Sequence, residues 1–309
     1  MDQIKIFVPA TIANISCGFD VLGLALKNVG DEMTIRKVAK KGIAITKIIG
    51  QDLPLETHKN VAGVAALALL SETDCDCGFE IEINKQIKPG SGIGSSAASS
   101  AGAVWAINEL LGKPFNTTDL VRFAMEGERL ATGVAHADNV APALFGGFTL
   151  VRSYEPLDII NINTPSDLYA TVIHPQIEVK TADAREILKT TVPLKEAIKQ
   201  WGNVGGLISG LYTEDYELIG RSLQDYIIEP IRSILIPAFD AVKQQSLKAG
   251  ALGCGISGSG PSIFALSKGE TNASKVAEAM KLVYDKVGID YDIHISKVNK
   301  KGINILENN

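Results

Sequence analysis

The sequence lacks long apolar runs, an excess of positive charge and paired cysteines. No segment approaches the roughly 20 consecutive apolar residues that cross a bilayer. Residues 1 to 5 are not a basic segment followed by a long apolar run, so they do not resemble a secretory signal. We therefore expect a cytoplasmic protein with no membrane partner.

The four cysteines show none of the spacings that are typical of metal sites or disulfide frameworks. Zinc-binding cysteine pairs usually have at least two residues between them, whereas Cys75 and Cys77 are separated only by Asp76. Cys17 and Cys254 lie far from this pair along the chain. We expect neither a zinc site nor a disulfide framework, and we expect the thiols to be free.

The formal net charge is −5, and basic residues cluster only as pairs at positions 36 to 37, 40 to 41 and 300 to 301. A nucleic-acid interface requires a larger basic patch, so we expect no nucleic-acid partner. A small charged substrate needs only local positive charge. Because 46% of the 309 residues are hydrophobic and 21% are charged, the chain can bury a full core, and its length predicts two domains.

The most informative segment is residues 80 to 112. It begins with the alternation of polar and apolar residues that is typical of a strand, and it ends in an alanine-rich helix before Gly112. Between the strand and the helix lies the loop KPGSGIGSS at residues 88 to 96. Glycines allow the backbone to approach a polyphosphate closely, and the start of the helix offers free N–H groups and a positive dipole. We interpret the segment as an ATP phosphate loop.

Two other kinds of glycine loop do not fit this spacing. A Walker A loop requires a lysine followed by Ser or Thr after its last glycine, but Gly94 is followed by Ser95 and Ser96. A dinucleotide fingerprint requires two residues between its second and third glycines, and the spacing here is Gly-x-Gly-x-Gly. On its own, such a run is more often a flexible loop with a serine cap, so our interpretation depends on the other motifs.

The patterns in the first half of the chain predict a mixed α and β domain. Residues 154 to 165 are polar, contain proline and have little strand character, so we place the domain boundary there, between residues 1 to 160 and 161 to 309. Before it we expect strands at 4 to 8, 33 to 38, 43 to 49 and 145 to 151, and helices at 60 to 70, 96 to 111 and 117 or 118 to 132.

The second half predicts a ferredoxin-like order of elements, which makes the whole chain α+β. We expect a strand at 168 to 174, helical segments up to 213, at 216 to 226 and at 237 to 249, and a second glycine-rich loop at 253 to 261. A strand at 262 to 266, a helix at 272 to 286 and a strand at 291 to 298 follow.

Several polar residues outside the glycine loop are candidates for ligand binding. Asn14 and Asp20 lie in a non-periodic, glycine-interrupted segment, where they are either turn residues or cleft residues. Glu128, near the end of a helix, suits Mg²⁺, which prefers one or two carboxylates with phosphate oxygens, although a solvated helix face is the usual place for a glutamate. His136 alone is more often a satisfied loop histidine than a ligand.

Three segments resemble, in order, the motifs of the GHMP small-molecule kinase superfamily: PATIANISCGFD at residues 9 to 20, GSGIGSSA at 90 to 97 and GISGSGPS at 255 to 262. HADNVAP at 136 to 142, VKTADAR at 179 to 185 and EPIR at 229 to 232 further resemble the homoserine kinase family. The resemblance covers nearly the whole chain. It implies an N-terminal domain like domain 2 of ribosomal protein S5, a ferredoxin-like C-terminal domain, and a cleft between them for ATP and substrate.

The resemblance also implies Mg²⁺-assisted transfer of a phosphoryl group from ATP to L-homoserine in threonine biosynthesis, and it makes a homodimer plausible. Catalytic roles carry over to Ser96, Glu128, Asp138 and Asn139, with Ser96 and Glu128 as Mg²⁺ ligands. Nucleotide contacts carry over to Asn60, Lys88, Pro89, Gly90, Ser91, Gly92, Ile93, Gly94, Ser95, Ser96, Ala97 and Ala98. Substrate contacts carry over to Asn14, Asp20, His136, Asp138, Asn139, Thr181, Arg185, Arg232 and Gly258.

These residues suit L-homoserine chemically. Its carboxylate matches the guanidinium forks of Arg185 and Arg232, and its ammonium matches the carboxylate of Asp20, although surface ion pairs are the commoner use of arginine. Mevalonate kinases, which belong to the same superfamily, place an aspartate where this chain has Asn139, and an amide cannot accept a proton near neutral pH. We therefore assign no side-chain base and expect Asn139 to orient the hydroxyl for direct in-line attack.

Three alternatives stay open at this point. A superfamily kinase for mevalonate, a sugar or shikimate would have little use for a carboxylate beside two arginines, because these substrates lack an ammonium group. A catalytically silent nucleotide-binding regulator would not need the complete set of hydroxyl, acid and glycine residues. An NAD-dependent oxidoreductase would require the dinucleotide spacing that the glycine loop lacks.

Overall fold

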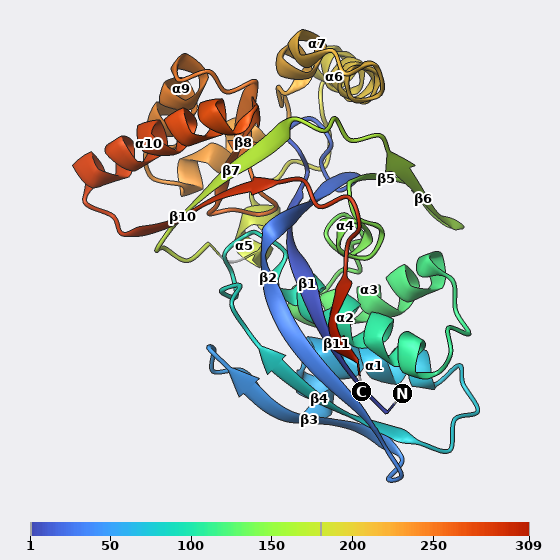
Figure 1. Cartoon of the computed structure of the whole chain (residues 1–309). Coiled ribbons are helices and arrows are strands. Elements are labelled where there is room, and N and C mark those ends of the chain that lie inside the picture. The colour runs from blue at the N-terminus through green and yellow to red at the C-terminus, as the bar shows by residue number, and fades with distance from the viewer. Residues whose placement is uncertain (1, 180, 309) are drawn as a thin grey trace.

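The computed structural model of the chain describes residues 2 to 179 and 181 to 308, apart from the side chains of residues 181, 182 and 308. Two sheets with helices packed against them make up the fold (Figure 1), which confirms the predicted α+β class. No described helix combines the length and the apolar character that crossing a bilayer requires.

The first sheet has seven strands in the order β11-β1-β2-β4-β3, with β5 paired to β2 and to β6. Neighbouring strands are antiparallel, except for the parallel pair β3 and β4. The fully buried Ile4, Ile6 and Val8 alternate along β1 and face the core. The strands are β1 (Gln3–Ala13), β2 (Leu22–Val38), β3 (Gly42–Ile49), β4 (Gly78–Asn84), β5 (Phe148–Tyr154), β6 (Leu157–Ile162) and β11 (Asn304–Asn308).

Four helices cover one face of this sheet: α1 (Val61–Leu70), α2 (Ser95–Leu110), α3 (Thr117–Thr132) and α4 (Val140–Phe145), after the short 3₁₀ helix η1 (Thr57–Lys59) (Figure 1). Glycines let α2 pack closely on both sides. A Cβ at Gly102 would lie 2.4 Å from the sulfur of Met33, and a Cβ at Gly127 of α3 would lie 2.2 Å from the hydroxyl oxygen of Ser100. This close packing places the start of α2 next to the last turns of α3.

The second sheet has four antiparallel strands in the order β10-β7-β9-β8. All residues of β7 are buried, because α10 packs against this strand and Leu168, Ala170 and Val172 join the main hydrophobic core. The strands are β7 (Leu168–Pro175), β8 (Gly253–Ile256), β9 (Ile263–Lys268) and β10 (Tyr291–Lys297). The helices are α5 (Thr181–Glu186), α6 (Leu194–Thr213), α7 (Tyr216–Ser222), α8 (Glu229–Arg232), η2 (Ser233–Leu235), α9 (Phe239–Lys248) and α10 (Glu270–Val287).

Several sequence expectations about local structure are wrong. Strand β6 occupies the segment where little strand character was expected, and β11 was not predicted at all. Both are edge strands with side chains exposed to solvent, for example 36% for Ile160 and 43% for Leu306, so neither needs a clear hydrophobic alternation. Residues 253 to 256, expected in a loop, form β8. The helix expected from 117 or 118 begins at Thr117, and Asn116 caps it through a capping box with Asp119.

The division of the chain at residue 160 stays a prediction. Strand β6 crosses that position, and β11, at the end of the chain, pairs with β1 in the first sheet. Figure 1 shows the red C-terminal strand beside the blue N-terminal one. Any domain that contains the whole first sheet therefore includes residues from both ends of the chain.

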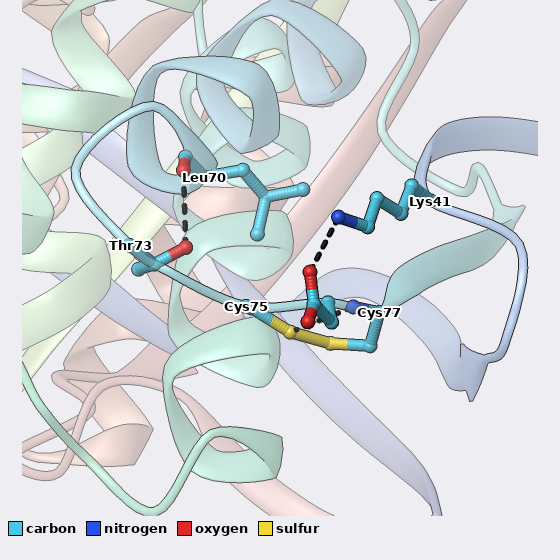
Figure 2. Close-up of a disulfide and its surroundings, with 6 residues drawn as sticks. Lys41, Leu70, Thr73, Cys75 and Cys77 are labelled. Carbon is cyan, nitrogen blue, oxygen red and sulfur yellow. Dashed lines mark hydrogen bonds and ion pairs between the residues drawn. A yellow bond between two sulfur atoms is a disulfide. The ribbon is translucent and has the colours of Figure 1, made fainter.

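The expectation of free thiols is wrong for Cys75 and Cys77, which form a disulfide (Figure 2). Their Cα atoms are 5.3 Å apart in the turn between α1 and β4, within the range that a disulfide spans. With a single residue between them, both side chains can point to the same side of the chain. The turn is also held by Thr73, whose hydroxyl donates to the carbonyl of Leu70 at 3.0 Å, and by an ion pair between Lys41 and Asp76. Cys17 and Cys254 are free and buried.

Candidate active site

A cavity of about 380 Å³ brings together the glycine loop, the end of α3 and the charged residues of the second half of the chain. Most of the residues predicted from the sequence line it. These are Asn14, Asp20, Pro89, Gly90, Gly92, Gly94, Ser95, Ser96, Glu128, His136, Asp138, Asn139, Arg185, Arg232 and Gly258.

The glycine loop joins β4 to α2 in a conformation that only glycine adopts easily. Gly90, Gly92 and Gly94 have φ values of 74°, 81° and 72°, in the left-handed region. A Cβ at Gly94 would also lie 2.0 Å from the hydroxyl oxygen of Thr11. The three glycines therefore allow the tight turn that leads into α2, where an anion meets N–H groups and the positive end of the helix dipole.

The glycine loop is hydrogen-bonded to the second glycine-rich segment, residues 255 to 262. Ser257 and Ser262 donate hydrogen bonds from their hydroxyls to the carbonyls of Gly92 and Ser91, at 2.7 and 2.6 Å. A Cβ at Gly92 would lie 2.6 Å from the carbonyl oxygen of Gly260. Two glycine-rich segments that are far apart in the sequence thus form one rigid wall of the cavity.

Some of the predicted nucleotide contacts do not line the cavity. Lys88 donates to the side chain of Gln176 at 2.6 Å, and Asn60 caps α1 by accepting from the N–H of Ala62 at 3.0 Å. The side chain of Thr181, predicted to contact the substrate, lies outside the described residues. The remaining loop residues are buried beneath the cavity wall: Ser91, Ile93, Ala97 and Ala98.

Sequence reasoning missed Lys85, which lines the cavity beneath the glycine loop. Its buried ammonium pairs with Asp31 and donates to the carbonyl of Ser95 at 2.6 Å and to the hydroxyl of Ser99 at 3.0 Å. Burial lowers the pKa of Lys85, while the attraction of Asp31 opposes that shift. Its position directly after β4 and before the glycine loop is the signal in the sequence that identifies it, because a residue there lies next to the start of α2.

Glu128 has an unused acceptor in the cavity. One carboxylate oxygen accepts from the hydroxyl of Ser96 at 3.1 Å, while Oε1 is buried without a hydrogen-bond partner. Burial raises the pKa of Glu128 to about 7, and the nearby Asp138 adds to the shift. A buried oxygen without a partner fits a cation ligand. No group of three or more His, Cys, Asp or Glu side chains that could hold a metal occurs within the described residues, so a cation here would also need oxygens from a phosphate.

Asn139 is the N-cap residue of α4, and its amide is already oriented by the protein. Its Oδ1 accepts a hydrogen bond from the hydroxyl of Thr11 at 2.7 Å. The amide NH₂ is therefore the end that can donate to a ligand. Thr11 was not predicted, because its role depends on a contact across 128 residues of sequence.

The other end of the cavity carries a cluster of charges around Asp20. Arg185 donates from one guanidinium nitrogen to both carboxylate oxygens of Asp20, at 2.9 and 3.1 Å, and Nδ1 of His136 lies 3.9 Å from the same group. Asp138 is buried nearby, and burial followed by repulsion from Asp20 raises its pKa to about 7. The side chain of Asn14 accepts from the N–H of Asp20 at 3.0 Å and donates to the carbonyl of Gly258 at 2.7 Å.

Arg232 is almost fully buried beside this cluster. Its guanidinium donates to the carbonyls of Ala184 and Gly258 at 2.7 and 3.4 Å. Burial, together with the positive charge of Arg185, lowers the pKa of Arg232 to about 10. The centroid of the Phe19 ring lies 5.0 Å from the guanidinium carbon of Arg232 and 5.5 Å from that of Arg185, so one aromatic ring contacts both groups. Phe19 was not predicted as a site residue.

The backbone that presents Asn14 and Asp20 is strained. Asn14, Ile15, Ser16 and Asp20 all have positive φ, between 41° and 72°. A β-branched residue such as Ile15 rarely adopts this conformation. Such strain persists only where the surrounding structure enforces it, which is common at functional sites.

Comparisons with known proteins agree with this geometry. The chain matches the family descriptions "GHMP kinases N terminal domain" over residues 60 to 147 and "GHMP kinases C terminal" over residues 207 to 286. It is 49% identical to a homoserine kinase of Chlorobium phaeobacteroides, over 99% of this chain and 100% of that protein. It is 41% identical to a homoserine kinase of Methanococcus vannielii, over 94% and 97% of the two chains.

Solved structures of related proteins also superpose on this chain. A crystal structure of homoserine kinase from Cytophaga hutchinsonii is 54% identical and superposes with a TM-score of 0.95, covering 99% of this chain and 98% of that one. A mevalonate kinase of L. major, only 16% identical over 95% and 96% of the chains, has a TM-score of 0.71 and shares the fold. On these matches over its full length, the chain belongs to the homoserine kinase family of the GHMP kinases.

Proposed function

We propose that this chain transfers the γ-phosphoryl group of ATP to the hydroxyl of L-homoserine, giving O-phospho-L-homoserine and ADP, in threonine biosynthesis in the cytoplasm. One observation carries the proposal: a single cavity holds the glycine loop at one end and, at the other, a carboxylate and two guanidiniums. A phosphate donor and a small zwitterionic alcohol would therefore meet inside it. Membership of the homoserine kinase family supports the same conclusion.

ATP would bind with its phosphates on the backbone of Gly90, Gly92 and Gly94 and on the first turn of α2. Ser96 and Glu128 would hold Mg²⁺, since one oxygen of Glu128 has no other partner. The metal, when bound, would supply positive charge against the phosphate oxygens. Lys85 lies below the loop and holds its backbone through the carbonyl of Ser95. The chain thus supplies positioning and charge stabilisation, which dominate phosphoryl transfer.

L-Homoserine would bind at the opposite end of the cavity. Its carboxylate would pair with Arg232. Burial and the nearby charge of Arg185 disfavour the positive charge of Arg232, and a negative charge beside it would offset both effects. Its ammonium would pair with Asp20, which is held by Arg185 in the free protein. Asp20 would then accept hydrogen bonds from both the ammonium and Arg185, so its negative charge would be paired with two positive groups.

Asn139 would orient the substrate hydroxyl for direct in-line attack on the γ-phosphate. Thr11 orients the amide through its Oδ1, so the NH₂ end is available to donate to the hydroxyl oxygen, and an amide cannot take the hydroxyl proton near neutral pH. No side-chain base is assigned, and a loose transition state needs little deprotonation beforehand.

The proposed reaction is tested by an ADP-release assay with L-homoserine and a panel of other alcohols, including mevalonate, galactose and shikimate. We expect kcat/KM for L-homoserine to exceed that for each other alcohol by roughly 100-fold or more, because only L-homoserine pairs with both charged groups. Higher kcat/KM for another alcohol would assign a different kinase activity. No ADP release with any of them would favour a silent nucleotide-binding regulator.

Replacing Asn139 by Ala should lower kcat by roughly 10- to 100-fold, because a hydroxyl that is not held in line reacts less often. The dissociation constants for ATP and L-homoserine should change much less. Asn28→Ala, an exposed asparagine on β2, is the control and should leave kcat unchanged. Steady-state kinetics with both substrates measures the effect, and an unaltered kcat for the Asn139 variant would remove the orienting role.

We also propose that the protein is a homodimer that associates through an exposed apolar face of α6. Leu194, Ile198 and Trp201 are 68%, 51% and 57% exposed and lie on one side of the helix, since they are spaced four and three residues apart. Gly202 and Gly205, next along this side, have no neighbouring atoms within 4 Å of the place where a Cβ would lie, so a second copy can approach closely. A two-fold interface requires such a self-complementary face.

Light scattering after size exclusion tests the homodimer. The native chain should have twice the mass of a monomer, and Trp201→Glu should convert it to the monomer because a buried charge at the interface is unfavourable. A monomeric native chain at micromolar concentration would rule out this association.

A further inference from the structure

We propose that a second, separate site on this protein binds compact multivalent anions. The site is a groove of about 270 Å³ that we call the lysine groove, and it is defined by Lys27, Lys297, Lys300 and Lys301. It shares no lining residue with the active-site cavity. The rest of its lining is Pro165, Ser166, Leu168, Val298 and Asn299.

The four ammonium groups of the lysine groove are not neutralised by the protein. Among the described residues, none of them forms an ion pair or a hydrogen bond, and only Lys297 has a partner, the ring of Tyr169 at 5.3 Å. This differs from the other two basic pairs in the sequence, where Arg36 pairs with Glu82 and Lys41 with Asp76. Four positive charges without counter-ions around one hollow, on a chain of net charge −5, favour an anionic ligand.

The segment that carries Lys300 and Lys301 is held in shape before any ligand binds. The buried side chain of Asn299 accepts from the N–H groups of Lys301 and Gly302 at 3.0 and 3.2 Å and donates to the carbonyl of Gly302 at 2.9 Å. Its backbone N–H donates to the carbonyl of Ala25 at 2.8 Å. A ligand therefore meets a preformed backbone and orders only the lysine side chains.

The lysine groove lies where the two sheets meet. Lys27 comes from β2 of the first sheet and Lys297 from the end of β10 of the second, and the N–H of Lys27 donates to the hydroxyl of Ser296 at 2.8 Å. The connection from β10 to β11 then runs past α4 (Figure 1), where the N–H of Ile303 donates to the carbonyl of Ala143 at 3.1 Å. An anion shared by these lysines would bridge both sheets and oppose their separation.

The chemistry of the lining indicates the class of ligand. Lysine presents a compact point charge without the fork of arginine, so the groove selects for charge rather than for the planar geometry of one group. Its volume suits a small molecule. We infer a compact anion with three or more negative charges, either an oligophosphate or a polycarboxylate.

The test is calorimetric titration with inorganic pyrophosphate or citrate in magnesium-free buffer, with the phosphate loop already filled by ADP. We expect one binding event per chain with at least one of the two probes, and a rise in the melting temperature with the concentration of the probe that binds. Preference for pyrophosphate would indicate a phosphorylated ligand, and preference for citrate a polycarboxylate. Absence of binding by both probes would overturn the proposal.

The variant that removes the site is Lys297→Gln, Lys300→Gln, Lys301→Gln. It should weaken probe binding at least about 10-fold, while kcat and both KM values stay unchanged because none of these lysines lines the active-site cavity. The matched control is Lys195→Gln, Lys248→Gln, Lys286→Gln, which removes the same charge from exposed positions on α6, α9 and α10. Equal weakening in the control would show general attraction by net charge and would exclude a defined site.

Discussion

Replacing Glu128 by Gln is expected to remove most of the kinase activity and, at the same time, to stabilise the ligand-free protein above neutral pH. Both effects follow from the same buried carboxylate. It accepts one hydrogen bond from Ser96 and leaves its other oxygen without a partner. Gln keeps the shape of the side chain and the acceptor for Ser96, but it removes the charge that would hold Mg²⁺.

The stability effect has a defined pH dependence. Burial raises the pKa of Glu128 from 4.5 to about 7, so the folded protein binds this proton more tightly than the unfolded chain. The contribution of Glu128 to folding is therefore fully present below pH 4.5 and is lost as the pH rises through about 7. A shift of this size corresponds to roughly 3 kcal/mol, so Glu128→Gln should raise the free energy of unfolding by about 1 to 3 kcal/mol at pH 8 and by much less at pH 5.

Urea unfolding at pH 5 and pH 8 in the absence of Mg²⁺ measures this difference. Activity should fall roughly 100-fold or more, with a weaker dependence on Mg²⁺ concentration, as expected for the loss of several kcal/mol of charge stabilisation. Glu126→Gln is the matched control on the same helix, because its carboxylate is 42% exposed and pairs with Arg129. An unaltered Mg²⁺ dependence, or a destabilised variant at pH 8, would contradict the role of Glu128.

Replacing Arg232 by Leu is expected to raise the KM for L-homoserine by roughly 10- to 150-fold, the effect of losing about 1.5–3 kcal/mol from a charged hydrogen bond. Binding of ATP should change little. Arg232 contacts Ala184, Gly258 and the ring of Phe19, none of which belongs to the glycine loop. Leu fills part of the same buried space without the charge, so the substrate carboxylate loses its partner.

Calorimetry with ATP and steady-state kinetics with L-homoserine separate the two effects for Arg232→Leu. Arg221→Leu removes an exposed arginine from α7 and should leave both measurements unchanged. If ATP and L-homoserine binding weakened to the same extent in the Arg232 variant, Arg232 would not belong to the substrate end of the cavity. Circular dichroism spectra that match those of the native chain would exclude general unfolding as the cause.

Much of the lining of the candidate active-site cavity was predictable because the glycine loop needs particular residues in a short segment. The loop turns with positive φ at three positions, which favours glycine at Gly90, Gly92 and Gly94. Ser95 and Ser96 follow directly in the first turn of α2. These requirements are local, so they appear in the sequence as a motif. The helices and buried strands were predictable for a similar reason, since their hydrophobic patterns follow from burying one face.

Other features depended on contacts between distant residues, and these the sequence alone does not reveal. Lys85 pairs with Asp31 across 54 residues, and Arg185 pairs with Asp20 across 165. Phe19 lies against two arginines that come from different helices, α5 and α8. Each side chain alone is compatible with an ordinary surface or core position, and only the packing of the two sheets gives it a partner.

By itself, the sequence determined the position of the glycine loop, the α+β class and most of the residues around the cavity, because backbone conformation and hydrophobic periodicity constrain residue types locally. The tertiary structure decided which charges face one another, where the last strand pairs, and that four lysines surround one groove without counter-ions among the residues it describes. Electrostatic partners and edge-strand pairing depend on distances between segments remote in sequence, and folding of the whole chain sets those distances.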